Sequence, residues 1–222
     1  MKQTVLLLVL IAAVGLGCRL LGGSGDSGGT SGGAGGGLSG GSDPKGDLVA
    51  ASKKFVDLRS FSAKMQGKGI TNGVENDIKQ QVDYVAPDRY HVIYQAGVAA
   101  GMELVFIGGD MFMKPAGGNW SKSPGGGAAM PTLRDSFTEE GLKSLADAKY
   151  EGEETINGKT ALVYSYKNVT PKGDFPFTAK MYVNKSTGVP LRVFAQYSNG
   201  VLKEMTINYD VDSPVTIEAP AT

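Results

Sequence analysis

Short turns between runs of alternating apolar and polar residues constrain the fold of this chain more than any other feature. Asn157-Gly158, Thr187-Gly188 and Asn199-Gly200 each separate two such runs, and Pro87-Asp88 and Gly108-Gly109 mark two further turns. Two-residue turns of this kind join antiparallel strands, because their backbone twist matches the twist of the flanking strands. A parallel sheet would instead need long crossovers, which are usually helical, so a βαβ fold is excluded.

The spacing of apolar residues predicts ten or so strands and two helices. Asp47 is the predicted N-cap of a helix over residues 47–58, in which apolar residues recur on one face. A similar spacing predicts a second helix over residues 133–148. The predicted strands cover residues 61–65, 78–84, 90–94, 102–107, 111–113, a short stretch around Trp120, and then 149–155, 159–168, 177–184, 191–197, 201–209 and 215–218.

These elements together predict the architecture. A long antiparallel sheet must curl, split or be covered, because its apolar face cannot remain in water. Two amphipathic helices are enough to cover one concave face. We therefore expect an α+β fold that is mostly antiparallel β: a curved, open half-barrel covered by two or more helices.

The first residues have the pattern of a bacterial export signal. Lys2 precedes an uncharged apolar run over residues 5–14, which is too short to span a bilayer comfortably. The sequence Gly15-Leu16-Gly17-Cys18 follows and resembles the lipobox of bacterial lipoproteins, although the lipobox usually has Leu where this chain has Gly15. We expect a signal peptide over residues 1–17 and lipidation, with palmitate or similar acyl chains, on Cys18. An ordinary secretory signal with an incidental cysteine is the alternative.

A glycine-rich segment follows Cys18. Twelve glycines lie between Gly22 and Gly41, and the segment offers little apolar surface to offset its ordering entropy. We expect residues 18–46 to form a flexible tether and residues 47–222 to form one folded domain. The expected location is the extracytoplasmic or periplasmic face of the cell membrane or outer membrane, held by the lipid anchor.

Composition excludes several functional classes. The 22 Lys and Arg residues balance 22 Asp and Glu residues, and no basic patch suggests a nucleic-acid partner. With one cysteine and one histidine, His91, the chain cannot supply a Cys/His zinc site. We expect no catalytic residues, no metal and no cofactor, and therefore a binding protein and not an enzyme.

Four stretches of the sequence resemble stretches of the LolA-like superfamily of lipid and lipoprotein carriers, especially of its lipid-anchored LppX/LprG-like members. They resemble, in order, a strand and turn, a hairpin with a tryptophan, a second hairpin, and the ending of that family. These stretches cover residues 81–90, 106–113 followed by Asn119-Trp120, 182–192, and 208–210 followed by 214–220. The resemblance implies a half-barrel with a helical lid and an apolar cavity for acyl chains, and it implies no catalytic residues.

Such a cavity needs an apolar concave wall, and flexible methionines suit varied acyl chains. The same inward alternation equally describes a filled core, so the pattern does not separate the two. The candidate cavity residues are Phe61, Met65, Val82, Tyr94, Leu104, Phe106, Met111, Met113, Leu162, Tyr164, Met181, Val193, Met205 and Ile207, together with Met102. Trp120 is either a rim residue or a packing residue, and residues 123–130 form either a gate or a plain surface loop.

We therefore expect a membrane-anchored, extracytoplasmic lipoprotein that binds and carries lipids or lipid-modified proteins. Its expected partners are a lipid or acylated ligand and the membrane. The alternative is an envelope sensor or protein-interaction module with the same fold and a protein partner.

Overall fold

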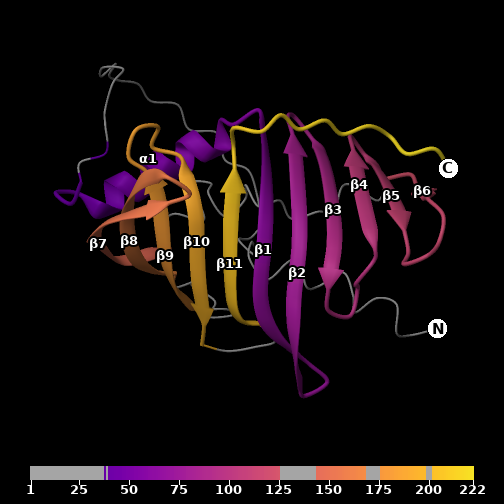
Figure 1. Ribbon diagram of the computed structural model, residues 1–222, viewed down its shortest axis with the longest axis horizontal. Helices are drawn as coiled ribbons and strands as arrows, with labels where there is room; N and C mark the ends of the chain where they lie inside the picture. The colour runs from indigo at the N-terminus through magenta and orange to yellow at the C-terminus, as the bar shows by residue number, and fades with distance from the viewer. Residues whose placement is uncertain (1–37, 39, 126–143, 169–175, 199–201) are drawn as a thin grey trace, which may run out of the picture.

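The computed structural model describes residues 38, 40–125, 144–168, 176–198 and 202–222. In these ranges the chain forms one eleven-stranded antiparallel sheet with a helix packed against it (Figure 1). The elements are α1 (Pro44–Val56), β1 (Ser60–Thr71), β2 (Val74–Val85), β3 (Arg89–Ala96), β4 (Glu103–Ile107), β5 (Asp110–Lys114), β6 (Ser121–Ser123), β7 (Leu145–Ile156), β8 (Lys159–Asn168), β9 (Phe177–Asn184), β10 (Pro190–Tyr197) and β11 (Leu202–Asp210).

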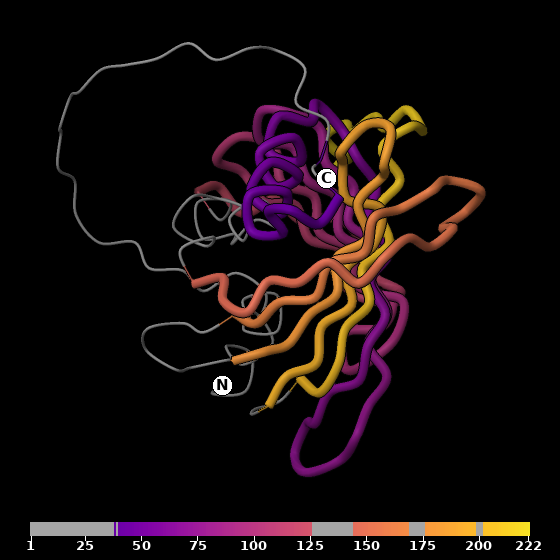
Figure 2. Tube along the Cα trace, turned by 90° about the vertical axis from the view of Figure 1, so that its left-hand side faces the viewer, coloured from indigo at the N-terminus to yellow at the C-terminus, as the bar shows by residue number. Residues whose placement is uncertain are grey.

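The sheet consists of two meanders joined at its centre. Its strand order is β6-β5-β4-β3-β2-β1-β11-β10-β9-β8-β7, so every neighbour except β1 and β11 is also a neighbour in sequence. The first and last strands of the fold pair with each other, with Ala63 opposite Tyr209 and Met65 opposite Ile207. Strands β6 and β7 are the two edges, so the sheet stays open. It curves, and α1 lies on its concave side (Figure 2).

Several of the predicted hairpin turns are confirmed. Asn157 and Gly158 have φ values of 50° and 77°, which is the left-handed pair that a type I′ turn requires. Gly188 of the predicted Thr187-Gly188 turn also has a positive φ, 72°. Asn72 and Gly73, a turn that was not predicted, make the same kind of connection between β1 and β2, with φ values of 53° and 79°. The predicted turn at residues 199–200 lies outside the described residues.

Helix α1 starts earlier than the sequence analysis predicts. Its N-cap is Asp43, whose side chain accepts a hydrogen bond from the backbone N–H of Gly46 at 3.0 Å. Pro44 occupies the first helical turn, where a missing N–H costs nothing. The prediction that Asp47 is the N-cap is therefore wrong: Asp47 lies within the first turn and is buried.

The predicted second helix is not confirmed. Residues 126–143 lie outside the described residues, and the end of the predicted helix, from Leu145 to Ala148, belongs to strand β7. There Leu145 pairs with Asn168 of β8, and the register shifts after Ala146, around Asp147 at a φ of 54°. In the described part of the chain α1 is the one helix, so the expectation of two or more covering helices is wrong for these residues.

The predicted final strand over residues 215–218 is also wrong. The segment after β11 runs along one end of the sheet without joining the sheet (Figure 1). Ile217 instead packs with Val105 and Phe112 on the outer face, and its carbonyl accepts a hydrogen bond from Arg89 Nη1 at 3.1 Å. Side-chain packing, this hydrogen bond and an ion pair between Lys159 and Asp212 hold the segment in place of a ladder.

Candidate ligand site on the concave face

Strand register places all the predicted cavity residues on one face of the sheet. Residues directly opposite each other in antiparallel neighbours point to the same side. One row across the sheet therefore contains Tyr94, Gln80, Met65, Ile207, Val193, Met181, Tyr164 and Tyr150. A second row contains Met113, Leu104, Val92, Val82, Ala63 and Tyr209, and a third contains Met111, Phe106, Tyr90, Tyr84 and Phe61.

Most of these residues are buried in one apolar cluster. Thirteen of the fourteen candidates that lie in strands belong to or pack against this cluster, with Met111 partly buried. Met113 shares the concave face with Leu104 but is 38% exposed, because β5 lies near the edge of the sheet. Met102 is partly buried against the same cluster.

Helix α1 covers the end of the concave face that carries Phe61 and Tyr209. The ring of Phe55, fully buried, has its centroid 4.8 Å from that of Phe61 and 4.8 Å from that of Tyr209. At the other end of the helix, Tyr164 Oη donates a hydrogen bond of 2.8 Å to Asp47 Oδ2. Burial, and then this bond to a carboxylate, raise the pKa of Tyr164, so the hydroxyl stays protonated and the contact persists at neutral pH. We call this part of the concave face the helix-covered half.

Strands β8 to β11 continue beyond α1 (Figure 2). We call the concave face of this continuation the distal half. Its next row across the sheet contains Ile78, Gly67, Met205, Ala195, Ala179 and Tyr166. Three of these six residues are glycine or alanine, so the surface of the distal half is recessed between its larger side chains. We call this recessed surface the low floor of the distal half.

Aromatic residues border this low floor. Tyr197 pairs with Phe177, and their ring centroids are 5.3 Å apart. The ring of Tyr166 lies 6.4 Å from that of Phe177 in an edge-to-face arrangement. All three side chains are partly buried, and burial raises the pKa of Tyr197 to about 12. The hydroxyls are therefore neutral hydrogen-bonding groups near neutral pH.

Two amides lie on the same face. Gln80 is 7% exposed and is flanked in its row by Met65 and Tyr94. Asn168 lies opposite Phe177, next to the aromatic border. The Oδ1 atom of Asn168 is buried and has no hydrogen-bond partner among the described residues. In native proteins nearly all buried polar atoms form a hydrogen bond. Asn168 Oδ1 is therefore an acceptor to which no described residue donates.

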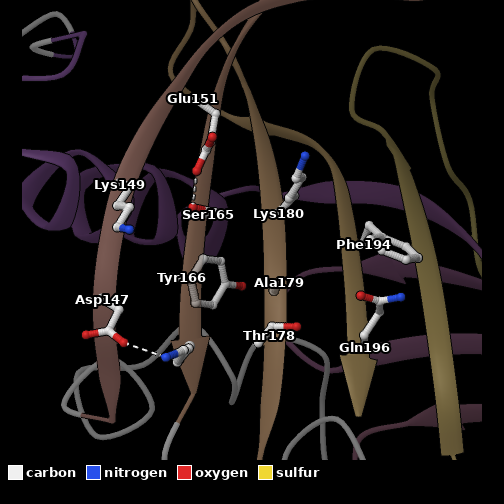
Figure 3. Close-up of a pocket in the computed structure, with 11 residues that line it drawn as sticks. Asp147, Lys149, Glu151, Ser165, Tyr166, Thr178, Ala179, Lys180, Phe194 and Gln196 are labelled. Atoms are coloured by element: carbon white, nitrogen blue, oxygen red, sulfur yellow. Dashed lines mark hydrogen bonds and ion pairs between the residues drawn. The ribbon is translucent and has the colours of Figure 1, made fainter. Parts of the chain in front are cut away.

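A separate pocket lies on the outer face of strands β7 to β10 (Figure 3). Its volume is about 270 Å³. Most of its lining alternates along each strand with the concave-face residues, and Tyr166 and Ala179 of the concave row also border it. Lys167 Nζ lies 2.8 Å from Asp147 Oδ2, and Ser165 donates to Glu151, whereas Lys180 points away from both pairs. The sequence analysis did not predict this pocket, because scattered charges on alternate positions are typical of any solvated sheet face.

The other residues singled out in the sequence have structural roles. Trp120 packs against the outer-face cluster of Val105 and Phe112, which favours the packing interpretation over the rim. His91 Nε2 lies 3.2 Å from Glu103 Oε2, and Lys114 Nζ lies 2.9 Å from Glu103 Oε1. The loop over residues 123–130 lies mostly outside the described residues.

The described ranges contain no group of three or more His, Cys, Asp or Glu side chains placed to hold a metal ion. None of their helices has the length and hydropathy needed to cross a membrane. Cys18 is outside these ranges, so its lipidation stays a prediction.

The architecture is similar to that of solved bacterial lipoproteins. LppX from Mycobacterium tuberculosis matches with a TM-score of 0.57 and 13% identity, over 79% of this chain and 98% of that chain. LprF from Mycobacterium bovis matches with a TM-score of 0.56 and 14% identity, over 81% of this chain and 98% of that chain. A LolA superfamily protein from Nitrosomonas europaea also matches, with a TM-score of 0.32 and 12% identity over 75% of this chain and 91% of that one. No family model and no curated protein matches the sequence. The open, curved sheet with a helix on its concave side has the fold of LppX and LprF, as the resemblance to LppX/LprG-like proteins implied.

Proposed function

We propose that this protein is a membrane-anchored, extracytoplasmic lipoprotein that binds and carries a lipid or an acylated ligand on its concave face. The observation that carries the proposal is the distal half, where the apolar face continues beyond α1 over a low floor. Apolar surface of this kind stabilises an acyl chain by removing it from water, at about 25 cal/mol per Å² of buried area. Half-open sheets with apolar interiors and few polar groups are typical ligand sites.

The side chains of the distal half suit a flexible ligand. Met205 lies opposite the small residues Gly67 and Ala195, and Met65 and Met181 lie in the neighbouring row. Methionine has three rotatable bonds and a polarisable sulfur, so it adapts to acyl chains of different length and branching. The arrangement offers shape and apolar contact and supplies no reactive group, which supports binding over catalysis.

Anchoring rests on the first 46 residues. Lipid on Cys18 and the glycine-rich segment after it would hold the domain near one membrane while leaving it free to reorient. The fold of LppX and LprF and the export pattern at Lys2 and residues 5–14 support this location. The resulting role is a tethered carrier that takes up or presents lipid close to its own membrane.

The test is native mass spectrometry of the full chain, purified without harsh detergent, followed by organic extraction. We expect a bound lipid near one per protein. The variant Ala179→Phe fills the floor of the distal half and is expected to lose the lipid, while Thr178→Phe places the same ring on the outer face and is expected to keep it. A chain of bare mass from native membranes, or equal lipid content in both variants, would contradict the proposal.

A second candidate function is an envelope sensor or interaction module that binds a protein. The pocket on the outer face favours it, because its mixed charges and the side chain of Phe194 face solvent away from the lipid site. This candidate predicts that Lys180→Glu abolishes a stable complex in envelope extracts without changing lipid content. Lipid binding without such a complex would contradict this second candidate function.

A further inference from the structure

Charge is segregated between the two faces of the sheet. On β8, β9 and β10 the charged residues Lys159, Lys167, Lys180 and Arg192 all lie on the outer face. The rows of the concave face that run from Tyr94 to Tyr150 and from Ile78 to Tyr166 contain no Lys, Arg, Asp or Glu. A charged ligand group placed there would lose its hydration and meet no opposite charge in these described rows, which is strongly unfavourable.

The polar side chains in these two rows are neutral, and the buried carboxylate of Asp47, which α1 places beside them, accepts a hydrogen bond from Tyr164. Asn168 Oδ1 is buried and unpaired among the described residues, and an orphaned acceptor is stabilised by any donor that reaches it. It lies beside Phe177, at the border where Tyr166 and Tyr197 place their rings. An amide acceptor on the same face as two tyrosines matches a ligand that carries uncharged hydroxyl groups.

From this arrangement we infer that the concave face selects lipids whose polar group is uncharged and donates a hydrogen bond, such as a hydroxyl, and that Asn168 receives that donor. Phospholipids and fatty acids, whose phosphate or carboxylate would be buried without a partner, are rejected. The inference rests on the proposed lipid-binding function and names the ligand class for the same site. Acyl chains occupy the low floor, and the hydroxyl lies at the aromatic border.

The experiment compares three lipids with identical acyl chains on the purified full chain: a diacylglycerol, the corresponding phosphatidylglycerol, and the diacylglycerol acetylated at its free hydroxyl. Each is offered in neutral detergent micelles, and bound lipid is counted by native mass spectrometry at pH 7. We expect diacylglycerol to bind at least tenfold more tightly than phosphatidylglycerol. Equal binding of these two would overturn the inference and leave the proposed function intact, whereas no binding of any lipid would refute the proposed function itself.

Asn168→Leu tests the role of the amide. The variant is expected to lose about tenfold in affinity for diacylglycerol, the size expected for one hydrogen bond to a buried group. The variant and the chain without the substitution are expected to bind the acetylated lipid with equal affinity. This binding also shows that the variant is folded. Thr178→Leu, on the outer face of β9, is the control and should change neither affinity. Parallel losses for both lipids, or no loss for either, would show that Asn168 is not the acceptor.

Discussion

Gly67 provides the sharpest test of the central pairing between β1 and β11. A Cβ built on Gly67 would lie 2.2 Å from the backbone carbonyl oxygen of Glu204 and 3.1 Å from Met205 Cα, whereas real Cβ contacts are essentially never under 3.0 Å. Neither atom belongs to a flexible side-chain end, so Gly67→Ala requires the two strands to move apart by about 1 Å. Gly67 is not among the residues with positive φ, so the effect would come from this contact and not from backbone strain.

The magnitude follows from what that displacement disturbs. Overpacking costs about 1–3 kcal/mol, and each weakened ladder hydrogen bond adds about 1 kcal/mol, so we expect about 3 kcal/mol of lost stability. For a domain of this size, that corresponds to a fall in Tm of roughly 6–12 °C. The loss should be large because β1 and β11 are the strands that join the two halves of the sheet.

Urea unfolding followed by circular dichroism measures this loss. The matched control is Gly109→Ala, since a Cβ at Gly109 meets nothing within 4 Å. This control is expected to change the free energy of unfolding by less than about 0.5 kcal/mol. If Gly67→Ala unfolded at the same urea concentration as the unmodified chain, the close approach of β1 and β11 in the described register would be refuted.

Two further predictions concern the helix contact and acid stability. Phe55→Ala removes a fully buried ring that contacts Phe61 and Tyr209, so it should cost about 3–5 kcal/mol in urea unfolding; a cost below about 1 kcal/mol would mean that α1 does not pack there. Hydrogen bonding to Lys114 lowers the pKa of Glu103 below its usual 4.5, so this carboxylate stabilises the fold above pH 4.5 and the contribution disappears as the pH falls through its folded pKa. Glu103→Gln should therefore reduce the loss of unfolding free energy as the pH falls below 4.5. An unchanged loss of unfolding free energy in this pH range would contradict this reasoning.

Local signals in the sequence account for the elements that were predicted correctly. The Asn157-Gly158 turn depends on two adjacent residues that tolerate positive φ, and this preference does not depend on the rest of the chain. Alternation along β8 and β9 likewise predicted that Leu162, Tyr164 and Met181 share a face, because successive strand residues always point to opposite sides.

Ambiguous local signals explain two of the errors. Asp43 and Asp47 both precede apolar helical positions, and Pro44 was the signal that favours the earlier cap. Leu145 fits a helical spacing, yet in the structure it pairs with Asn168 in the sheet. A short apolar pattern cannot decide between helix and strand when a neighbouring strand offers hydrogen bonds, because tertiary pairing outweighs the small differences in propensity.

The antiparallel order, the apolar face and the absence of a Cys/His metal site can be predicted from the sequence, because they follow from neighbouring residues and from composition. The pairing of β1 with β11, the low floor beside Met205 and the lack of a described partner for Asn168 Oδ1 become visible in the folded structure alone. Each of these depends on residues far apart in the chain meeting at one place. The pairing register that brings them together is selected by the packing of the whole sheet, and no local pattern encodes it.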